Sequence, residues 1–311
     1  MKKINTVLGE IEIKDLGSVL CHEHVACFSP VMKQALGNKW FDTDAVTERA
    51  IRLFKQAKDE CGVDTIIDGT PFDLGRDIDM IRKVAEQSGV NIIVSSGMYY
   101  SEEPFLAGKS PEDFAQYFID ECENGIKETG IKPGFLKCGT DKSGITPINK
   151  MLLETMSIVQ RETGLPLFAH NAHYIKSAYE QIKIFEENGV NLSQVVIGHC
   201  SDSRDADYLE DLLCRGCYLG FDRIYAGAYT EQAKTMYELI KRGWEEKLLV
   251  SHDYYAFIDF GGNTWESIQQ SDRDFTVVHK KLLPELKRLG ATDEQIFKIT
   301  NENPERLLGG I

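Results

Sequence analysis

Short apolar segments recur along the chain, and each is followed by a longer segment whose apolar positions repeat at helical spacing. Several of the short segments, such as NIIV at 91–94 and QVVI at 194–197, are apolar on both faces, which is typical of buried parallel strands. The pattern predicts eight strands, at residues 18–24, 64–70, 91–97, 134–138, 165–170, 194–199, 216–221 and 247–252. It also predicts helices at residues 43–60, 76–88, 111–129, 146–163, 174–188, 204–214, 230–242, 275–289, 293–299 and 304–308.

This strict alternation of strand and helix predicts an α/β fold, and eight repeats predict a closed (β/α)8 TIM barrel. A doubly wound parallel sheet is the alternative architecture. No linker rich in proline, glycine or serine interrupts the pattern. We therefore expect one barrel domain over residues 1–311, with a short N-terminal β extension and C-terminal helices.

The net charge of the chain makes two classes of binding partner improbable. The 311 residues carry a formal net charge of -14, which disfavours nucleic acid and anionic membrane surfaces as partners. No apolar run approaches the ~20 residues of a membrane span.

The N-terminus and the cysteines indicate the compartment. Glu10 and Glu12 interrupt any signal-peptide core after Lys2 and Lys3, so we predict a cytoplasmic protein. The 8 cysteines are too sparse for a disulfide scaffold, and we expect free thiols.

Histidines concentrate where a barrel carries its chemistry, at the C-terminal ends of strands. His22 and His24 end the first predicted strand, and alternation places both on one face, with Cys21 and Glu23 on the other. Two imidazoles on one face can bind one metal ion, whereas the alternative is a pair of hydrogen-bonded core histidines. By the same alternation, His252 is expected to point outward.

Further candidate ligands end other strands. His170 and His199 end the fifth and sixth, and Asp253 follows the eighth, which neighbours the first when the barrel closes. Four histidines and an aspartate at one mouth predict a site for one or two transition metals. Lys137 ends the fourth strand; it either reaches solvent or binds metal after losing its charge.

Six motifs in this order resemble the phosphotriesterase-like branch of the amidohydrolase superfamily, especially its lactonases. The resemblance extends from about Thr6 to Leu308 and includes NENP at 301–304. The motifs are GSVLCHEH at 17–24, GFLKCG at 134–139, PLFAH at 166–170, VIGHCSD at 196–202, GFDR at 220–223 and VSHD at 250–253.

The resemblance implies a binuclear metal centre at the C-terminal face of the barrel. His22, His24 and Asp253 would hold the buried metal, and His170 and His199 the exposed one. Lys137 would be carboxylated by CO₂ (N6-carboxylysine) and bridge the pair. A hydroxide shared by the metals would attack the substrate, with Asp253 as general base. Zn²⁺ is the default metal, with Mn²⁺, Co²⁺ and Fe²⁺ as alternatives, and the resemblance suggests a homodimer.

The resemblance also implies a small-molecule substrate, an acyl or sugar lactone, with phosphotriesterase activity as a side reaction. Tyr99 and Arg223 would place the lactone, whereas the alternatives are a core phenol and a surface ion pair. A phosphorylated sugar lactone would need a basic group, for which Lys33, Arg223 and Arg273 are the candidates. A phosphotriester hydrolase and a non-catalytic metal-binding barrel are the competing functions.

Three lesser features have two interpretations each. The aromatic segment 254–265 is either a substrate lid or packing at the barrel mouth. Cys214 and Cys217 are a redox pair or, as we favour, two small buried side chains. His173 is a substitute ligand or substrate contact or, as we favour, an outer support or the start of a helix.

Overall fold

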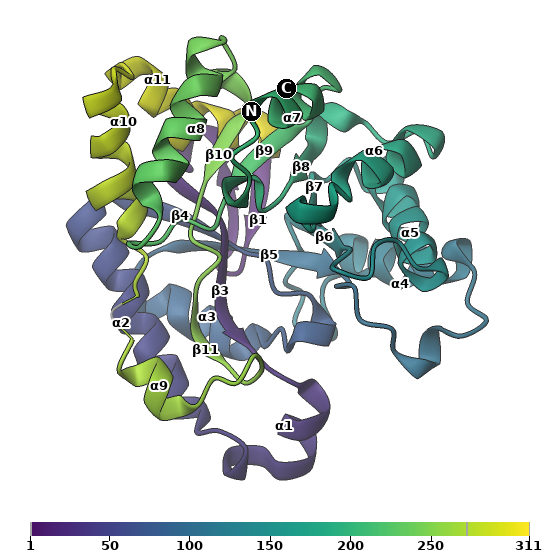
Figure 1. Cartoon of the computed structure of the whole chain (residues 1–311). Coiled ribbons are helices and arrows are strands. Elements are labelled where there is room, and N and C mark those ends of the chain that lie inside the picture. The colour runs from purple at the N-terminus through teal and green to yellow at the C-terminus, as the bar shows by residue number, and fades with distance from the viewer. Residues whose placement is uncertain (1, 272, 311) are drawn as a thin grey trace.

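A parallel sheet curls around the centre of the protein, in a computed structural model that describes residues 2–271 and 273–310 (Figure 1). Its strands lie in the order β10-β9-β8-β7-β6-β5-β4-β3-β11, and each pairs in parallel with its neighbours. Their bounds are β3 (Ser18–Cys27), β4 (Val63–Asp68), β5 (Asn91–Gly97), β6 (Phe135–Gly139), β7 (Leu167–His170), β8 (Val195–Ile197), β9 (Tyr218–Phe221), β10 (Leu248–Val250) and β11 (Tyr255–Ile258).

The sheet closes at the link between β10 and β11. The strand β10 pairs with β9, and β11 pairs with β3 at the other edge of the sheet. Within the link, the Asp253 amide donates to the His22 carbonyl at 3.1 Å, and the His24 amide donates to the Tyr254 carbonyl at 2.8 Å. The two short strands are therefore halves of an eighth barrel strand. The predicted TIM barrel is confirmed, and the doubly wound sheet is excluded.

Helices flank the sheet and alternate with its strands, as the periodicity predicts (Figure 1). Their amphipathic faces supply the outer core, in which Phe54 and Phe185 are fully buried. The chain ends in helices on the N-terminal side of the strands. The bounds are α2 (Thr43–Cys61), α3 (Ile78–Ser88), α4 (Pro111–Asn124), α5 (Pro147–Thr163), α6 (Ala178–Glu187), α7 (Ala206–Cys214), α8 (Tyr229–Lys241), α10 (Leu283–Leu289), α11 (Asp293–Phe297) and α12 (Asn303–Gly309).

Two helices have no counterpart in the prediction. The helix α1 (Pro30–Leu36) follows β3, and α9 (Trp265–Gln269) follows β11. Neither has an apolar stripe to reveal it, because α1 buries no residue and α9 buries only Ile268. Their starts are instead fixed by capping side chains, Ser29 for α1 and Thr264 for α9.

Short elements complete the chain. The strands β1 (Lys3–Thr6) and β2 (Gly9–Glu12) form an antiparallel hairpin that packs beside α12. Two π-helical segments, η9 (Val278–Leu282) and η10 (Lys298–Glu302), lead into α10 and α12. The 3₁₀ helices are η1 (Ile13–Asp15), η2 (Gly37–Lys39), η3 (Phe72–Leu74), η4 (Pro104–Leu106), η5 (His173–Ile175), η6 (Leu192–Gln194), η7 (Cys200–Asp202) and η8 (Glu245–Lys247).

An apolar cluster fills the barrel at the N-terminal ends of its strands. Cys21 belongs to this inner cluster, so the expectation from strand alternation that it faces away from the interior is wrong. The pairing of β3 with β4 shifts register between Leu20 and Glu23, and this bulge breaks the alternation. The inner cluster consists of Ile4, Ile13, Leu16, Val19, Cys21, Ile67, Ile93, Phe135, Phe168, Val196, Tyr218, Leu249, Leu307 and Leu308.

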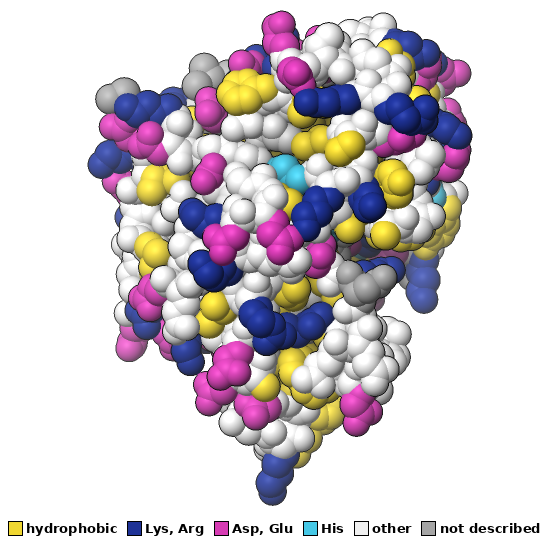
Figure 2. All heavy atoms as spheres, turned by 90° about the vertical axis from the view of Figure 1, so that its left-hand side faces the viewer, with side chains coloured by type: hydrophobic (Ala, Val, Ile, Leu, Met, Phe, Trp, Pro, Cys, Tyr) yellow, Lys and Arg dark blue, Asp and Glu magenta, His cyan; other side chains and the backbone are white. Residues whose placement is uncertain are grey.

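The surface mixes charges of both signs. Basic and acidic side chains intermingle over the face shown in Figure 2, so the net negative charge is not gathered into one patch there. Among the described residues, no helix combines the length and the low polarity that crossing a bilayer requires. All eight cysteines are free thiols, as predicted.

Candidate metal centre

The C-terminal ends of the strands bring the first group of predicted ligands together. The Nε2 atom of His24 lies 3.1 Å from Oδ1 of Asp253, and Nε2 of His22 lies 3.6 Å from the same oxygen. The Lys137 side chain projects from β6 to the same point, where its Nζ lies 2.7 Å from His22 Nε2. Only 1% of Lys137 is exposed, so the interpretation of a lysine that reaches solvent is wrong.

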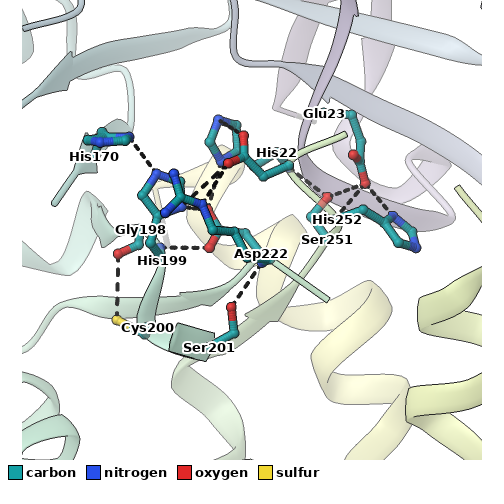
Figure 3. A network of polar contacts seen from close by, with 12 residues as sticks. His22, Glu23, His170, Gly198, His199, Cys200, Ser201, Asp222, Ser251 and His252 are labelled. Carbon is teal, nitrogen blue, oxygen red and sulfur yellow. Dashed lines mark hydrogen bonds and ion pairs between the residues drawn. The ribbon is translucent and has the colours of Figure 1, made fainter. Parts of the chain in front are cut away.

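The second group of predicted ligands, His170 and His199, lies beside His22 (Figure 3). Nε2 of His199 is 2.5 Å from Nδ1 of His170, and both side chains are buried. Nδ1 of His199 lies 3.8 Å from Oδ2 of Asp253, which joins the two groups. The structure thus brings together six predicted residues from five segments of the chain: His22, His24, Lys137, His170, His199 and Asp253.

Asp222 bridges the two groups of ligands through hydrogen bonds, although it was not among the predicted site residues. Its carboxylate accepts a hydrogen bond from His22 Nδ1 at 2.7 Å and from the His199 amide at 2.6 Å (Figure 3). The bond from His22 Nδ1 leaves Nε2 of that ring free to bind a metal. The signal for Asp222 was present, since it directly follows β9, the place from which the other candidates project.

Burial keeps two of the candidate ligands, His22 and His170, in the protonation state that metal binding needs. It lowers the pKa of His22 to about 3 and that of His170 well below the ordinary value, so both imidazoles are neutral at pH 7. At His24, by contrast, Cys27 and Asp253 outweigh burial and raise the pKa well above its ordinary value. Burial also lowers the pKa of Lys137 to about 8, which brings the amine close to its neutral, nucleophilic form. The aspartate stays ionised, because the Arg223 guanidinium and the hydrogen bond from His24 outweigh burial and hold the pKa of Asp253 well below its ordinary value.

The donor set fits a metal better than it fits a hydrogen-bonded core. Nδ1 of His199 is buried and lies 3.2 Å from Oδ2 of Asp222, the oxygen that also faces His22 Nδ1, so three polar atoms crowd together there. The sets His22–His24–Asp253 and His22–His199–Asp222 each place one possible ligand atom per residue within 4.8 Å of the others. In the second set, Asp222 already accepts the Nδ1 proton of His22, so we interpret it as the support of a ligand. Imidazole and carboxylate donors suit Zn²⁺ and related ions.

Tyr99 and Arg223 both reach this cluster. The Tyr99 hydroxyl lies 3.0 Å from His170 Nδ1, and burial raises the pKa of the phenol well above its ordinary value, so it is a neutral donor. Arg223 donates from Nε to Asp253 Oδ2 at 2.8 Å and from Nη1 to Asp202 Oδ2 at 3.0 Å. The Tyr99 hydroxyl thus contacts the cluster, and Arg223 forms ion pairs, as its alternative interpretation expected, with Asp202 and with Asp253 of the cluster.

A cavity of about 400 Å³ opens beside Asp253 and Arg223. Tyr255–Ile258, expected to belong to a substrate lid or to pack at the mouth, forms β11 of the barrel wall, and Tyr255 also lines the cavity. The cavity is lined by Asp202, Arg223, Ile224, Tyr225, Ala226, His252, Asp253, Tyr254, Tyr255, Arg273, Asp274 and Val277.

Gly69 is required for the packing of the first histidine. A Cβ atom at this position would lie 2.5 Å from Cδ2 of His22 and 2.8 Å from its Nε2, far inside van der Waals contact. The neighbouring Thr70 hydroxyl lies 2.8 Å from Nδ1 of His24. The turn after β4 therefore orients both histidines of β3.

Three lesser predictions have mixed outcomes. His252 points away from the cluster, as predicted, and its Nδ1 lies 2.6 Å from Glu23 Oε1. His173 begins η5, and its Nδ1 is 4.0 Å from Asp202 Oδ2 at the edge of the site. Cys217 is buried but Cys214 is exposed, so the expectation of two buried thiols is wrong for Cys214.

The chain is similar to known proteins over nearly its whole length. A phosphotriesterase homology protein of Mycobacterium tuberculosis is 35% identical, covering 99% of this chain and 98% of its own. An aryldialkylphosphatase of Saccharolobus solfataricus is 33% identical over 95% of this chain and 96% of its own. An N-acetyltaurine hydrolase of Mus musculus is 25% identical over 98% and 97% of the two chains.

A solved structure and a family profile agree with these relatives. The structure of the phosphotriesterase from Mycobacterium tuberculosis superposes with a TM-score of 0.92, at 35% identity, over 99% of this chain and 98% of that one. The profile of the phosphotriesterase family matches residues 2–308. The barrel, the cluster at its mouth and these similarities together show that the chain belongs to the phosphotriesterase family.

Proposed function

We propose that this phosphotriesterase-family hydrolase opens a lactone ring at the cluster of six residues. The observation that carries the proposal is the position of two further side chains. The Tyr99 hydroxyl approaches the cluster at His170, and the Arg223 guanidinium approaches it at Asp253. A lactone carbonyl between them would meet a neutral donor and a cation at the oxygens that gain negative charge.

The cluster would hold two divalent ions, with Zn²⁺ as the default. His22, His24 and Asp253 would bind one ion and His170 and His199 the other. Burial keeps the imidazoles of His22 and His170 neutral. When bound, such ions lower the pKa of a shared water from near 16 toward ~7 and polarise the substrate oxygen.

Lys137 would bridge the two ions as a carbamate. The ammonium group would first lose one proton, and the neutral amine would then add to the carbon of CO₂ and lose a second, so that a side chain of charge +1 becomes one of charge -1. The lowered pKa of Lys137 favours this reaction because only the unprotonated amine is nucleophilic. The product would place an anion where an ammonium now lies 2.7 Å from His22 Nε2.

Residues of the chain would also accept the proton that the attacking hydroxide loses. Asp253 would accept it as general base, since its carboxylate lies beside both histidine groups. Arg223 would keep Asp253 ionised and lies between it and Asp202, so a positive charge flanks the base throughout turnover.

The cavity allows more than one kind of lactone. Ile224, Tyr225 and Val277 offer apolar surface for an acyl chain. Arg273 lies 5.5 Å from the centre of the Tyr225 ring and lines the cavity, so it is available to a phosphorylated sugar. Lys33 is unsuitable, because its ammonium group donates to the Phe41 carbonyl and to the Thr43 hydroxyl in the segment that follows α1.

The test is a comparison of kcat/KM on metal-reconstituted protein. The panel contains an acyl lactone, a phosphorylated sugar lactone, a paraoxon-like triester and an N-acetylated aminosulfonate, because relatives are named for the last two classes. We expect a lactone to give the highest kcat/KM and a chelator to abolish turnover. A higher value for the triester or the amide would replace the proposal with that function. Full metal occupancy without turnover would indicate a non-catalytic metal-binding barrel.

A further inference from the structure

Glu23 stands between two candidate ligands but faces away from the cluster. It follows His22 and precedes His24 in β3, and its side chain is 0% exposed. In Figure 3 it lies on the far side of β3, directed toward Ser251 and His252. A buried carboxylate is costly unless it is hydrogen-bonded, so its partners indicate its role.

Four donors converge on this carboxylate, and all come from one short segment. Oε1 accepts from Ser251 Oγ at 2.7 Å, from the His252 amide at 2.9 Å and from His252 Nδ1 at 2.6 Å. Oε2 accepts from the Tyr254 amide at 3.0 Å. The segment from Ser251 to Tyr254 is the link between β10 and β11, and it contains Asp253.

The link needs such support because Asp253 has an unusual backbone. Its φ is 51°, in the left-handed region that side chains other than glycine seldom adopt. Glu23 holds the residues on both sides of Asp253, and the Asp253 amide itself donates to the His22 carbonyl. A carboxylate can accept all four bonds, whereas a glutamine would direct an NH₂ group toward at least one donor.

The contacts also tie the link to both neighbouring elements. Ser251 Oγ donates to Glu23 and accepts from the His22 amide at 3.0 Å. His252 Nε2 accepts a hydrogen bond from the Val278 amide at 3.0 Å. The ring proton is therefore on Nδ1, which donates to Glu23. The network therefore spans β3, the link and η9.

We infer that Glu23 is a positioning residue that fixes the link so that the Asp253 carboxylate faces His22 and His24. It acts through Asp253 and touches neither substrate nor ligand atoms. The inference rests on the proposed role of Asp253 as a metal ligand. By this inference Glu23 contributes to metal affinity, although its side chain points away from the metal ligands.

The decisive variant is Glu23→Gln, with Glu121→Gln as its matched control. Glu121 is another carboxylate that accepts several bonds, from Arg76 and Ser96, but it contacts none of the six cluster residues. Zn²⁺ affinity is measured by titrating metal-free protein against a competing chelator, together with thermal unfolding and with kcat and KM of the loaded enzyme. We expect Zn²⁺ affinity to fall about 10–100-fold in Glu23→Gln, and kcat to fall more than KM changes. Glu121→Gln should lose thermal stability and keep its Zn²⁺ affinity.

A folded Glu23→Gln that binds Zn²⁺ as tightly as the wild type would overturn the inference. Glu23→Asp keeps the charge on a shorter side chain and should recover part of the affinity. If Glu23→Gln does not fold, Ser251→Ala carries the test, because it deletes one donor and keeps the carboxylate; a fall of about 2–10-fold is expected, and no fall overturns the inference. Because the titration needs no substrate, a wild type that binds Zn²⁺ but opens no lactone refutes the proposed function alone.

Discussion

The two ends of the barrel interior are built from opposite kinds of side chain. The N-terminal ends of the strands enclose the inner cluster, whose members are nearly all apolar and are covered by the β1–β2 hairpin and α12. The C-terminal ends enclose imidazoles, carboxylates and an ammonium group. A matched pair shows the contrast: Lys247 Nζ lies 4.1 Å above the Tyr218 ring at the first end, and Lys137 Nζ lies 4.1 Å above the Phe168 ring at the second.

The difference separates the source of stability from the source of chemistry. Apolar burial stabilises the fold at the N-terminal end, whereas buried charges at the C-terminal end oppose folding until they are paired or bound. Lys247 is only partly buried, but Lys137 is fully enclosed. Substitutions at the two ends should therefore change different measured quantities.

The largest effect is expected at Lys137. In Lys137→Ala, kcat/KM should fall by more than about 100-fold, because loss of a group that merely supports a ligand already costs 10–100-fold. Metal content per chain should fall as well. The measurements are kinetics on the best lactone and elemental analysis of dialysed protein.

Lys247→Ala is the matched control for that experiment. It removes the same cation from above an aromatic ring at the other end of the barrel, so metal content and kcat/KM should stay near wild-type values. Equal losses in the two variants would contradict the separation of the two ends.

Ile93→Ala tests the apolar end directly. Ile93 is fully buried in the inner cluster, and its truncation should lower the free energy of unfolding by about 2–5 kcal/mol. Zn²⁺ affinity should remain within a factor of about two. Denaturant titration of metal-free protein gives the first quantity and chelator competition the second; a large loss of Zn²⁺ affinity would show that the ends are coupled.

His279 should make the N-terminal end sensitive to acid. Its Nε2 lies 3.1 Å from Ser18 Oγ at the start of β3, and burial together with His252 lowers its pKa to about 4. Between pH 6.5 and 4 the unfolded chain binds a proton that the folded chain does not, so stability is full above pH 6.5 and is lost as pH falls toward 4. The loss should be at most about 3 kcal/mol. In His279→Gln the slope of unfolding free energy against pH should be shallower over this range, and an unchanged slope would exclude His279 as its cause.

Tyr99→Phe should have the smallest effect. It removes one neutral hydroxyl from the cluster, which is worth about 0.5–1.5 kcal/mol and so about 2–10-fold in kcat/KM on the lactone. Metal content should not change. If lactone turnover is unaffected while triester turnover falls, Tyr99 does not support lactone placement.

Much of this arrangement could be predicted from the sequence because periodicity and strand ends are local signals. The buried segment at 91–97 and the histidine that ends a strand at 170 follow from the apolar pattern and position alone, whereas the strand predicted to end at His24 continues to Cys27. The grouping of six residues at one mouth follows from barrel topology, which brings all C-terminal strand ends to one face.

What the sequence concealed depends on contacts between distant segments. The bulge in β3 redirects Cys21, and no local pattern reports it. The segment of β11 becomes a strand by pairing with β3, which is far away in the sequence. Without that contact, the sequence shows only an aromatic segment, which resembles a lid. Asp222 and Glu23 look like ordinary strand-end acids until the structure shows what each carboxylate accepts.

The closing link between β10 and β11 has a consequence for the order in which the protein matures. His24 and Asp253 are 229 residues apart in the chain, and the contact between them belongs to the pairing that completes the ring. Contacts of such long sequence separation carry a high entropic cost and tend to form late. When only the first seven strands have been synthesised, five of the six cluster residues are present but the site is incomplete. The site forms only when the last strand pairs with the first.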